Sequence, residues 1–165
     1  MEKKLNCILL IDDDEPTNFL STILIEEEDC TKHLQIAESG RQALNYLSNV
    51  KDESCDGNTS DFQPDLIFLD INMPCMNGWE FLEQYRQIKK DGNTKPVIIM
   101  LTTSLNPDDK LKSEGIPDVS GYENKPLTIE MLRRVIDQHF TPACNQIKTT
   151  ASVRNAPLTR SSVHP

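Results

Sequence analysis

With 165 residues, 37% of them hydrophobic and 26% charged, the chain is typical of one globular domain that can bury a core. No apolar run approaches the roughly 20 residues that span a bilayer, and the N-terminus lacks the apolar stretch of a signal peptide, so we expect a cytoplasmic protein with no membrane partner. Five cysteines without a C-x-x-C pair favour free thiols over a disulfide framework or a zinc site.

The negative charge is concentrated in the first part of the chain. The net charge is −9, and residues 141–165 contribute +3, which leaves −12 for residues 1–140. Nucleic-acid binding requires clustered Lys and Arg, so we expect no direct contact with nucleic acid. Residues 141–165 are also rich in Thr, Ser, Asn and Pro, which predicts a disordered tail after a folded domain over residues 1–140.

Short apolar runs alternate with helical patterns along the chain. Strands are predicted at Cys7–Ile11, Leu34–Ala37, Leu66–Ile71, Val97–Leu101 and, from a weaker pattern, Val119–Tyr122. Helical spacing of apolar residues predicts helices around Phe19–Leu24, Ala43–Val50, Phe81–Ile88 and Ile129–Phe140, with a short polar helix at Pro107–Ser113 anchored by Leu105 and Leu111. Continuous apolar strands alternating with amphipathic helices predict an α/β fold, a doubly wound (βα)5 unit with a five-stranded parallel sheet.

Some segments and side chains fall outside this pattern. Residues 51–63 are polar and acidic, which predicts an exposed loop. We expect His33 and His139 to be solvated surface residues rather than catalysts. Trp79 could belong either to the core or to a rim contact.

Polar side chains follow the predicted strands, at the point where each strand ends. The first strand leads into Asp12 and Asp13, the third into Asp70, the fourth into Thr102 and the fifth into Lys125. In doubly wound sheets, ligands bind beyond the carboxyl ends of the strands. We therefore expect these five side chains to form one site.

Three neighbouring acids predict a bound cation. Carboxylates that lie close together repel one another unless a cation offsets their charge. Oxygen ligands suit a hard ion such as Mg²⁺, which keeps several waters and leaves room for a phosphoryl oxygen. A metal and a lysine would neutralise an incoming phosphoryl group while a carboxylate attacks phosphorus.

Four motifs resemble those of the receiver domain of two-component response regulators. They are I-D-D at 11–13, L-D-I-N-M-P-x-M-N-G at 69–78, T-T-S at 102–104 and Y-E-N-K-P at 122–126. The resemblance covers about residues 5–140 and implies a flavodoxin-like fold in a stand-alone, single-domain regulator. Two positions depart from the pattern, since Asn77 stands where many receivers have Asp and Thr103 where a small residue is common.

The resemblance implies a role for each residue of the site. Asp70 would accept a phosphoryl group from a histidine kinase or a phosphotransfer protein. Asp12 and Asp13 would hold Mg²⁺ together with Asp70 and the backbone carbonyl of Asn72.

The resemblance also implies a switch that reads the phosphoryl group. Thr102 and Lys125 would contact that group, and the side chain of Tyr122 would change rotamer with it. The Lys125–Pro126 bond resembles the cis peptide of the family. The protein would then act as a signalling switch rather than an enzyme, and its altered surface would bind a downstream effector or a second copy.

Two alternatives remain open at this point. One is a pseudo-receiver adaptor that works without phosphorylation. The other is a Mg²⁺-dependent phosphatase with an aspartate nucleophile, as in haloacid dehalogenases. Those enzymes have a second acid two residues after the first, whereas here Asn72 stands two residues after Asp70.

Overall fold

The computed structural model describes residues 4–49, 62–88, 95–104 and 106–141. In this part of the chain, strands and helices alternate from end to end. The strands are β1 (Leu5–Ile11), β2 (Thr31–Ala37), β3 (Leu66–Asp70), β4 (Val97–Thr102) and β5 (Gly121–Asn124). The helices are α1 (Glu15–Glu27), α2 (Gly40–Asn49), α3 (Gly78–Ile88), α4 (Pro107–Glu114) and α5 (Ile129–Phe140).

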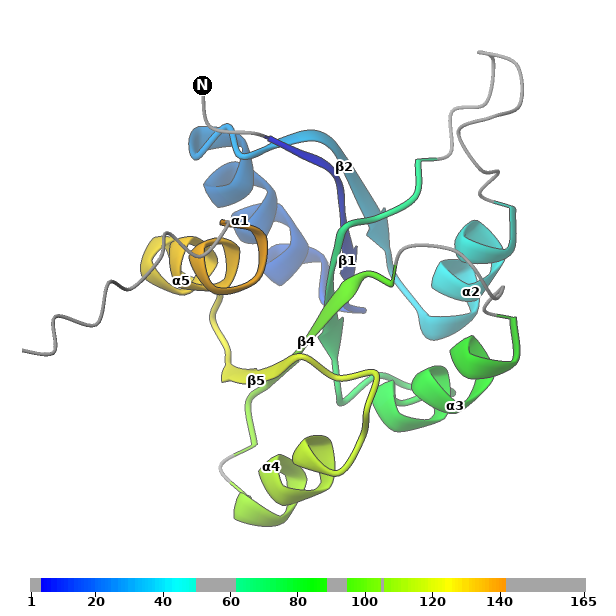
Figure 1. Cartoon of the computed structure of the whole chain (residues 1–165). Coiled ribbons are helices and arrows are strands. Elements are labelled where there is room, and N and C mark those ends of the chain that lie inside the picture. Colours follow the sequence, from blue (N-terminus) through cyan, green and yellow to red (C-terminus); the bar gives the residue numbers. More distant parts are fainter. Residues whose placement is uncertain (1–3, 50–61, 89–94, 105, 142–165) are drawn as a thin grey trace, which may run out of the picture.

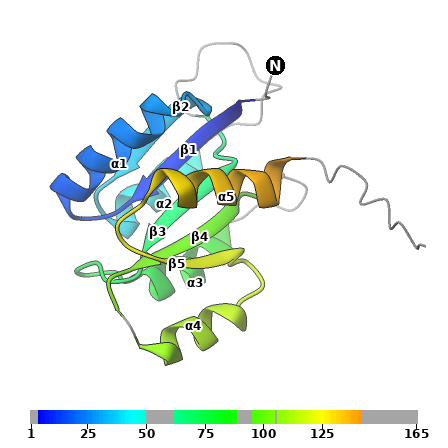
Figure 2. The same ribbon diagram turned by 90° about the vertical axis from the view of Figure 1, so that its left-hand side faces the viewer.

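The strands form one parallel sheet in the order β2-β1-β3-β4-β5. Helices α1 and α5 cover one face, and α2, α3 and α4 lie on the other (Figure 1). Figure 2 shows the first pair of helices in front of the sheet. Strand β2 is added on one side of β1 and the later strands on the other side, so the strand order reverses between β1 and β3. Doubly wound folds bind ligands at this switch point. The predicted (βα)5 fold is confirmed.

Two hydrophobic layers form because successive side chains of a strand point to opposite faces. On one face, Leu9 and Ile67 pack with Phe81 and Leu82 of α3 and with residues of α2. On the other face, alternate strand residues pack with α1 and α5, among them Ile8, Phe68, Ile99, Ile25, Leu132 and Val135. Both faces of the sheet are therefore buried, as its unbroken apolar strands predict.

Strand β5 lies two residues later than predicted. Val119 is in a turn, where its backbone N–H donates to the carbonyl of Ile116, and pairing with β4 begins at Gly121. The side chains of Val119 and Ile116 nevertheless pack against the α2–α3 layer. A turn whose apolar side chains pack against the core thus has the same sequence pattern as the start of a strand.

Helix α1 does not bury the face that its apolar spacing predicts. The side chains of Phe19 and Leu20 are 64% and 65% exposed, and Ile23 is also exposed. The buried residues of the helix include Asn18 and Ser21, two polar residues. Most of the apolar stripe therefore faces the solvent, and only its last member, Leu24, packs against the core.

Helix α4 is also anchored differently from the prediction. Leu111 is 66% exposed, and Leu105 lies outside the described residues. The helix buries Ser113 instead, and the ammonium of Lys112 lies 4.4 Å from the centre of the Trp79 ring on α3. Trp79 is partly buried against the core, so it is a rim contact that a cation covers.

The remaining predictions concern histidines, loops and membranes. His33 is half-buried and stacks on Phe62 with ring centroids 3.4 Å apart, so the prediction of a solvated residue is wrong there, whereas His139 is exposed. Most of the predicted loop at 51–63, and the predicted tail beyond residue 141, lie outside the described residues. In the described ranges, every helix is too short or too polar to span a membrane.

Candidate acidic site at the carboxyl ends of the strands

The register of the sheet brings the predicted site residues together. Ile11 pairs with Leu69, so Asp12 and Asp70, one residue further on, lie side by side. Asp70 in turn pairs with Leu101, which places Thr102 just beyond it. Thr102 pairs with Asn124, and Lys125 follows. The four strand ends therefore meet at one edge of the sheet.

Asp12 is fixed at every polar atom. Its backbone N–H donates to the carbonyl of Ala37 over 3.1 Å, and its backbone carbonyl accepts from the side-chain amide of Asn18 over 2.8 Å. The Oδ1 atom accepts from the backbone N–H of Asp14, and Oδ2 lies 2.5 Å from Nζ of Lys125. This buried carboxylate is thus held in a single orientation.

Lys125 lies between the two buried acids. Its Nζ is 2.5 Å from Oδ2 of Asp12 and 2.9 Å from Oδ2 of Asp70, and its side chain is only 11% exposed. Burial alone would lower the pKa of Lys125, but the hydrogen bonds and charges of the two acids outweigh it and raise that pKa. The ammonium therefore stays charged and partly neutralises the acidic site.

Burial has the opposite effect on the pKa of Asp12. It raises the pKa of Asp12 above its usual range, and the nearby charge of Asp70 adds to this rise. The hydrogen bond and charge of Lys125 and the N–H of Asp14 act against it without reversing it. A single ammonium does not compensate for two buried carboxylates, so the site can accept more positive charge.

The three acids are close enough to share one metal ion. Oxygen atoms of Asp12, Asp13 and Asp70 all lie within 4.8 Å of one another. Asp13 is exposed, and in the described residues its carboxylate has neither an ion pair nor a hydrogen bond. A set of oxygen donors with one open side fits a hard, partly hydrated ion such as Mg²⁺.

The loop after β3 shapes the wall next to Asp70. The backbone N–H of Asn72 donates to Oδ1 of Asp70 over 3.1 Å, and the N–H of Gly78 donates to the carbonyl of Ile71. A Cβ atom on Gly78 would lie 2.7 Å from the backbone oxygen of Asp70 and 3.0 Å from Cα of Ile71. Glycine at position 78 therefore lets the start of α3 approach the backbone of the acid.

Thr102 and Tyr122 lie on the β4–β5 side of the site. Thr102 is fully buried, and its Oγ1 accepts from the N–H of Ser104 over 2.9 Å and contacts the amide of Asn72 at 3.5 Å. The hydroxyl of Tyr122 is buried without a hydrogen bond of standard geometry to the described residues. Burial raises the pKa of Tyr122, Asp109 adds to the rise, and the hydroxyl of Thr102 opposes it. The two hydroxyls are therefore close enough to influence each other.

Two backbone features at Lys125 also belong to the site. The backbone N–H of Lys125 donates to the carbonyl of Thr102 over 2.8 Å. The Lys125–Pro126 peptide bond is cis, as the resemblance implies.

The sequence reasoning missed one residue of this site. Asn18 lies on the buried side of α1 and bonds to Asp12, although it is six positions from that acid. Its signal was a polar residue one position before the apolar pair Phe19 and Leu20, which helical spacing alone assigns to the solvent side. The structure brings together all the site residues that the sequence predicted.

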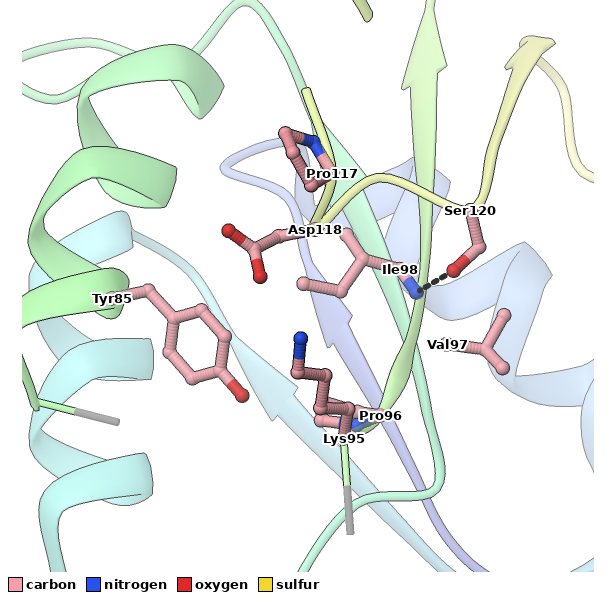
Figure 3. Close-up of a pocket in the computed structure, with 8 residues that line it drawn as sticks. All are labelled: Tyr85, Lys95, Pro96, Val97, Ile98, Pro117, Asp118 and Ser120. Carbon is pink, nitrogen blue, oxygen red and sulfur yellow. Dashed lines mark hydrogen bonds between the residues drawn. The ribbon is translucent and has the colours of Figure 1, made fainter. Parts of the chain in front are cut away.

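A separate small pocket lies at the opposite edge of the sheet (Figure 3). It is lined by Tyr85, Lys95, Pro96, Val97, Ile98, Pro117, Asp118 and Ser120. These residues surround the start of β4, whereas Thr102 ends that strand. The pocket is therefore not part of the acidic site.

Comparisons with known proteins agree with this geometry. The sequence pattern of the response regulator receiver domain matches residues 8–137. A crystal structure of a two-component response regulator from Cytophaga hutchinsonii is 32% identical, with a TM-score of 0.73, and the match covers 85% of this chain and 100% of that one.

Two curated relatives differ in how much of their own length is matched. The probable methanogenesis regulatory protein FilR2 of Methanothrix harundinacea is 28% identical over 79% of each chain. A probable cyclic di-GMP phosphodiesterase of Vibrio cholerae is 32% identical over 85% of this chain, which spans only 28% of that protein. The similarity thus lies in a shared domain and does not extend over that whole relative. The chain belongs to the response regulator receiver domain family of two-component systems.

Proposed function

We propose that this protein is a single-domain response regulator, with a receiver domain over residues 1–140, that is phosphorylated on Asp70. Receiver domains are signalling switches that work with histidine kinases and downstream effectors, and a histidine kinase, BarA of Escherichia coli, contains a region 27% identical to this chain. The observation that carries the proposal is the position of Asp70, which touches Lys125 on one oxygen and the N–H of Asn72 on the other.

The proposed reaction transfers a phosphoryl group from a phosphohistidine to Asp70. A carboxylate oxygen of Asp70 attacks phosphorus, a P–O bond forms, and the P–N bond breaks with its electron pair leaving on the imidazole nitrogen. Bound Mg²⁺ would supply positive charge to the phosphoryl oxygens. Asp12, Asp13, Asp70 and the backbone carbonyl of Asn72 would hold that ion.

The residues around Asp70 have separate tasks in this reaction. Lys125 would pair with a phosphoryl oxygen, because its ammonium already lies 2.9 Å from the attacking carboxylate. The hydroxyl of Thr102 would move to a second phosphoryl oxygen and give up its bond to the N–H of Ser104. The backbone at Thr103 and Ser104 would then shift.

The proposed signal leaves the site through Tyr122. Its buried hydroxyl lies near Thr102 and has no standard hydrogen bond in the described part of the chain. A displaced Thr102 changes the space available to that ring, so the surface formed by α4, β5 and α5 would change its affinity for an effector. Dimerisation through the same surface would be a further consequence of this arrangement.

The alternatives find less support in the site. An adaptor without phosphorylation would have no use for three converging carboxylates beside a charged lysine. A phosphatase of the haloacid dehalogenase type would need a second acid two residues after Asp70, and Asn72 occupies that position. We therefore favour a phosphoacceptor that does not turn over small substrates.

The test is intact mass spectrometry of the full chain after incubation with acetyl phosphate, with Mg²⁺ or with a chelator. We expect one added phosphoryl group in the presence of Mg²⁺ and none on Asp70→Asn. Asp65→Asn is the matched control, because Asp65 precedes the same strand but contacts the N–H of Asn6, far from the acidic site. A folded wild type that gains no mass would reject the proposal, and continuous hydrolysis of p-nitrophenyl phosphate would favour the phosphatase.

A further inference from the structure

We propose that Asn18 is a positioning residue that sets the affinity of the site for Mg²⁺, because it fixes the peptide bond between Asp12 and Asp13. The inference rests on the proposed function of the acidic site, and it concerns a residue outside the metal shell. Asn18 contacts neither Asp13 nor Asp70 through a hydrogen bond in the described residues.

A polar side chain is buried on the inner side of α1. Asn18 is only 5% exposed, whereas its neighbours Phe19 and Leu20 face the solvent. A buried amide is unfavourable unless it finds a hydrogen-bond partner. The side-chain amide of Asn18 finds that partner in the backbone carbonyl of Asp12, 2.8 Å away. The helix therefore buries a polar side chain and leaves two large apolar ones exposed.

Asp13 has no direct side-chain support. The carboxylate of Asp13 is exposed and has no ion pair or hydrogen bond in the described part of the chain. The direction in which the Asp13 side chain leaves the backbone is therefore set by the two peptide planes that flank it. Asn18 holds the carbonyl of the preceding plane, and Oδ1 of Asp12 holds the N–H of Asp14 in the following plane.

These two contacts together restrain both planes around a metal ligand. Loss of the Asn18 amide would leave the carbonyl of Asp12 without its donor and would let the preceding plane rotate. Asp13 would then spend less time with its oxygen near those of Asp12 and Asp70. Residues that orient metal ligands in this way typically contribute about 10- to 100-fold to metal affinity.

The experiment measures Mg²⁺ binding by isothermal titration calorimetry on the full chain, for the wild type, Asn18→Leu and Thr22→Val. Leucine has the same branching and the same number of side-chain heavy atoms as asparagine, and it lacks the donor. Thr22→Val is the matched control, since its hydroxyl donates over 2.8 Å to the carbonyl of Asn18 within the helix and does not reach the site. We expect about 10-fold weaker binding for Asn18→Leu and a change below about twofold for Thr22→Val.

A kinetic readout separates positioning from general damage. The Mg²⁺ concentration for half-maximal phosphorylation by acetyl phosphate should rise by the same factor in Asn18→Leu, while the rate at saturating Mg²⁺ stays within about twofold of the wild type. A lower saturating rate with unchanged Mg²⁺ affinity would overturn the inference. If Asn18→Leu does not fold, Asn18→Ser is measured in its place, with the same expectation.

The proposed function and this inference can fail separately. A wild type that binds no Mg²⁺ and gains no phosphoryl group would reject both. A wild type that does both, together with an Asn18→Leu variant of unchanged Mg²⁺ affinity, would reject the role of Asn18 alone.

Discussion

The ammonium of Lys125 lies 2.9 Å from Oδ2 of Asp70, so the proposed phosphoacceptor is paired with a cation before any phosphoryl group arrives. Lys125→Ala would leave two buried carboxylates without that cation. Breaking a buried pair in this way costs about 3 kcal/mol of the free energy of unfolding. We expect this loss in urea unfolding with a chelator present, and a partial recovery with Mg²⁺, because the metal supplies the missing charge.

The matched control for this variant is Lys110→Ala, an exposed lysine on α4. It should change the free energy of unfolding by less than about 0.5 kcal/mol. If Mg²⁺ stabilises Lys125→Ala no more than it stabilises the wild type, the charge argument is wrong.

The raised pKa of Asp12 predicts the effect of pH on stability. Folding raises the pKa of Asp12, so between the unfolded and folded pKa values the folded state binds more protons than the unfolded chain. The free energy of unfolding therefore falls as the pH rises through this range. Asp12→Asn should therefore raise the free energy of unfolding of the metal-free protein at pH 7. The gain over the wild type should shrink as the pH falls below the raised pKa, where the wild-type acid becomes neutral.

The measurement is urea unfolding of Asp12→Asn and the wild type at a series of pH values in the presence of a chelator. Calorimetry at the same pH values should show that Mg²⁺ binds the wild type more weakly as Asp12 is protonated. A variant that is less stable than the wild type at pH 7 would show that the bond from Lys125 matters more than burial.

The fold and the site residues were predictable from the sequence for a common physical reason. Strands buried on both faces have unbroken apolar runs, and parallel strands bring their carboxyl ends to one edge, so Asp70 after Leu66–Leu69 could be assigned to the site. The inner face of α1 was not predictable. Its apolar spacing fits Phe19 and Leu20 as well as Ile25, and that spacing does not signal the hydrogen bond that Asn18 makes to Asp12 on the buried side.

The orientation of α1 can be tested directly. Ile25→Ala, at a fully buried position, should lower the free energy of unfolding by about 2–5 kcal/mol. Leu20→Ala removes a similar side chain from the same helix but should cost less than about 0.5 kcal/mol, because that side chain is 65% exposed. Equal losses in urea unfolding would show that Leu20 is covered in solution.

The buried hydroxyl of Tyr122 predicts a substitution that does not destabilise the protein. The hydroxyl has no standard hydrogen bond in the described residues, so Tyr122→Phe removes an unsatisfied group and should raise the free energy of unfolding by up to about 1 kcal/mol. Tyr46→Phe is the control, because the hydroxyl of Tyr46 donates to the carbonyl of Phe62 over 2.6 Å and accepts from its N–H. That control should lose about 1 kcal/mol in thermal or urea unfolding, and a loss for Tyr122→Phe would reveal a partner for its hydroxyl.

The contact between Gly78 and the backbone of Asp70 predicts that one methyl group will disturb the site. The Cβ of Gly78→Ala would lie 2.7 Å from the backbone oxygen of Asp70, and backbone atoms cannot move aside as a flexible side chain can. We expect a loss of about 1–3 kcal/mol in the free energy of unfolding, which is typical of overpacking. Phosphorylation by acetyl phosphate should also slow, because Asp70 has to shift.

Gly115→Ala is the control, since its Cβ would meet nothing closer than 3.5 Å and its φ of −79° suits any residue. It should leave stability within about 0.5 kcal/mol of the wild type, and a Gly78→Ala variant equally close to the wild type in both measurements would show that the loop after β3 can yield.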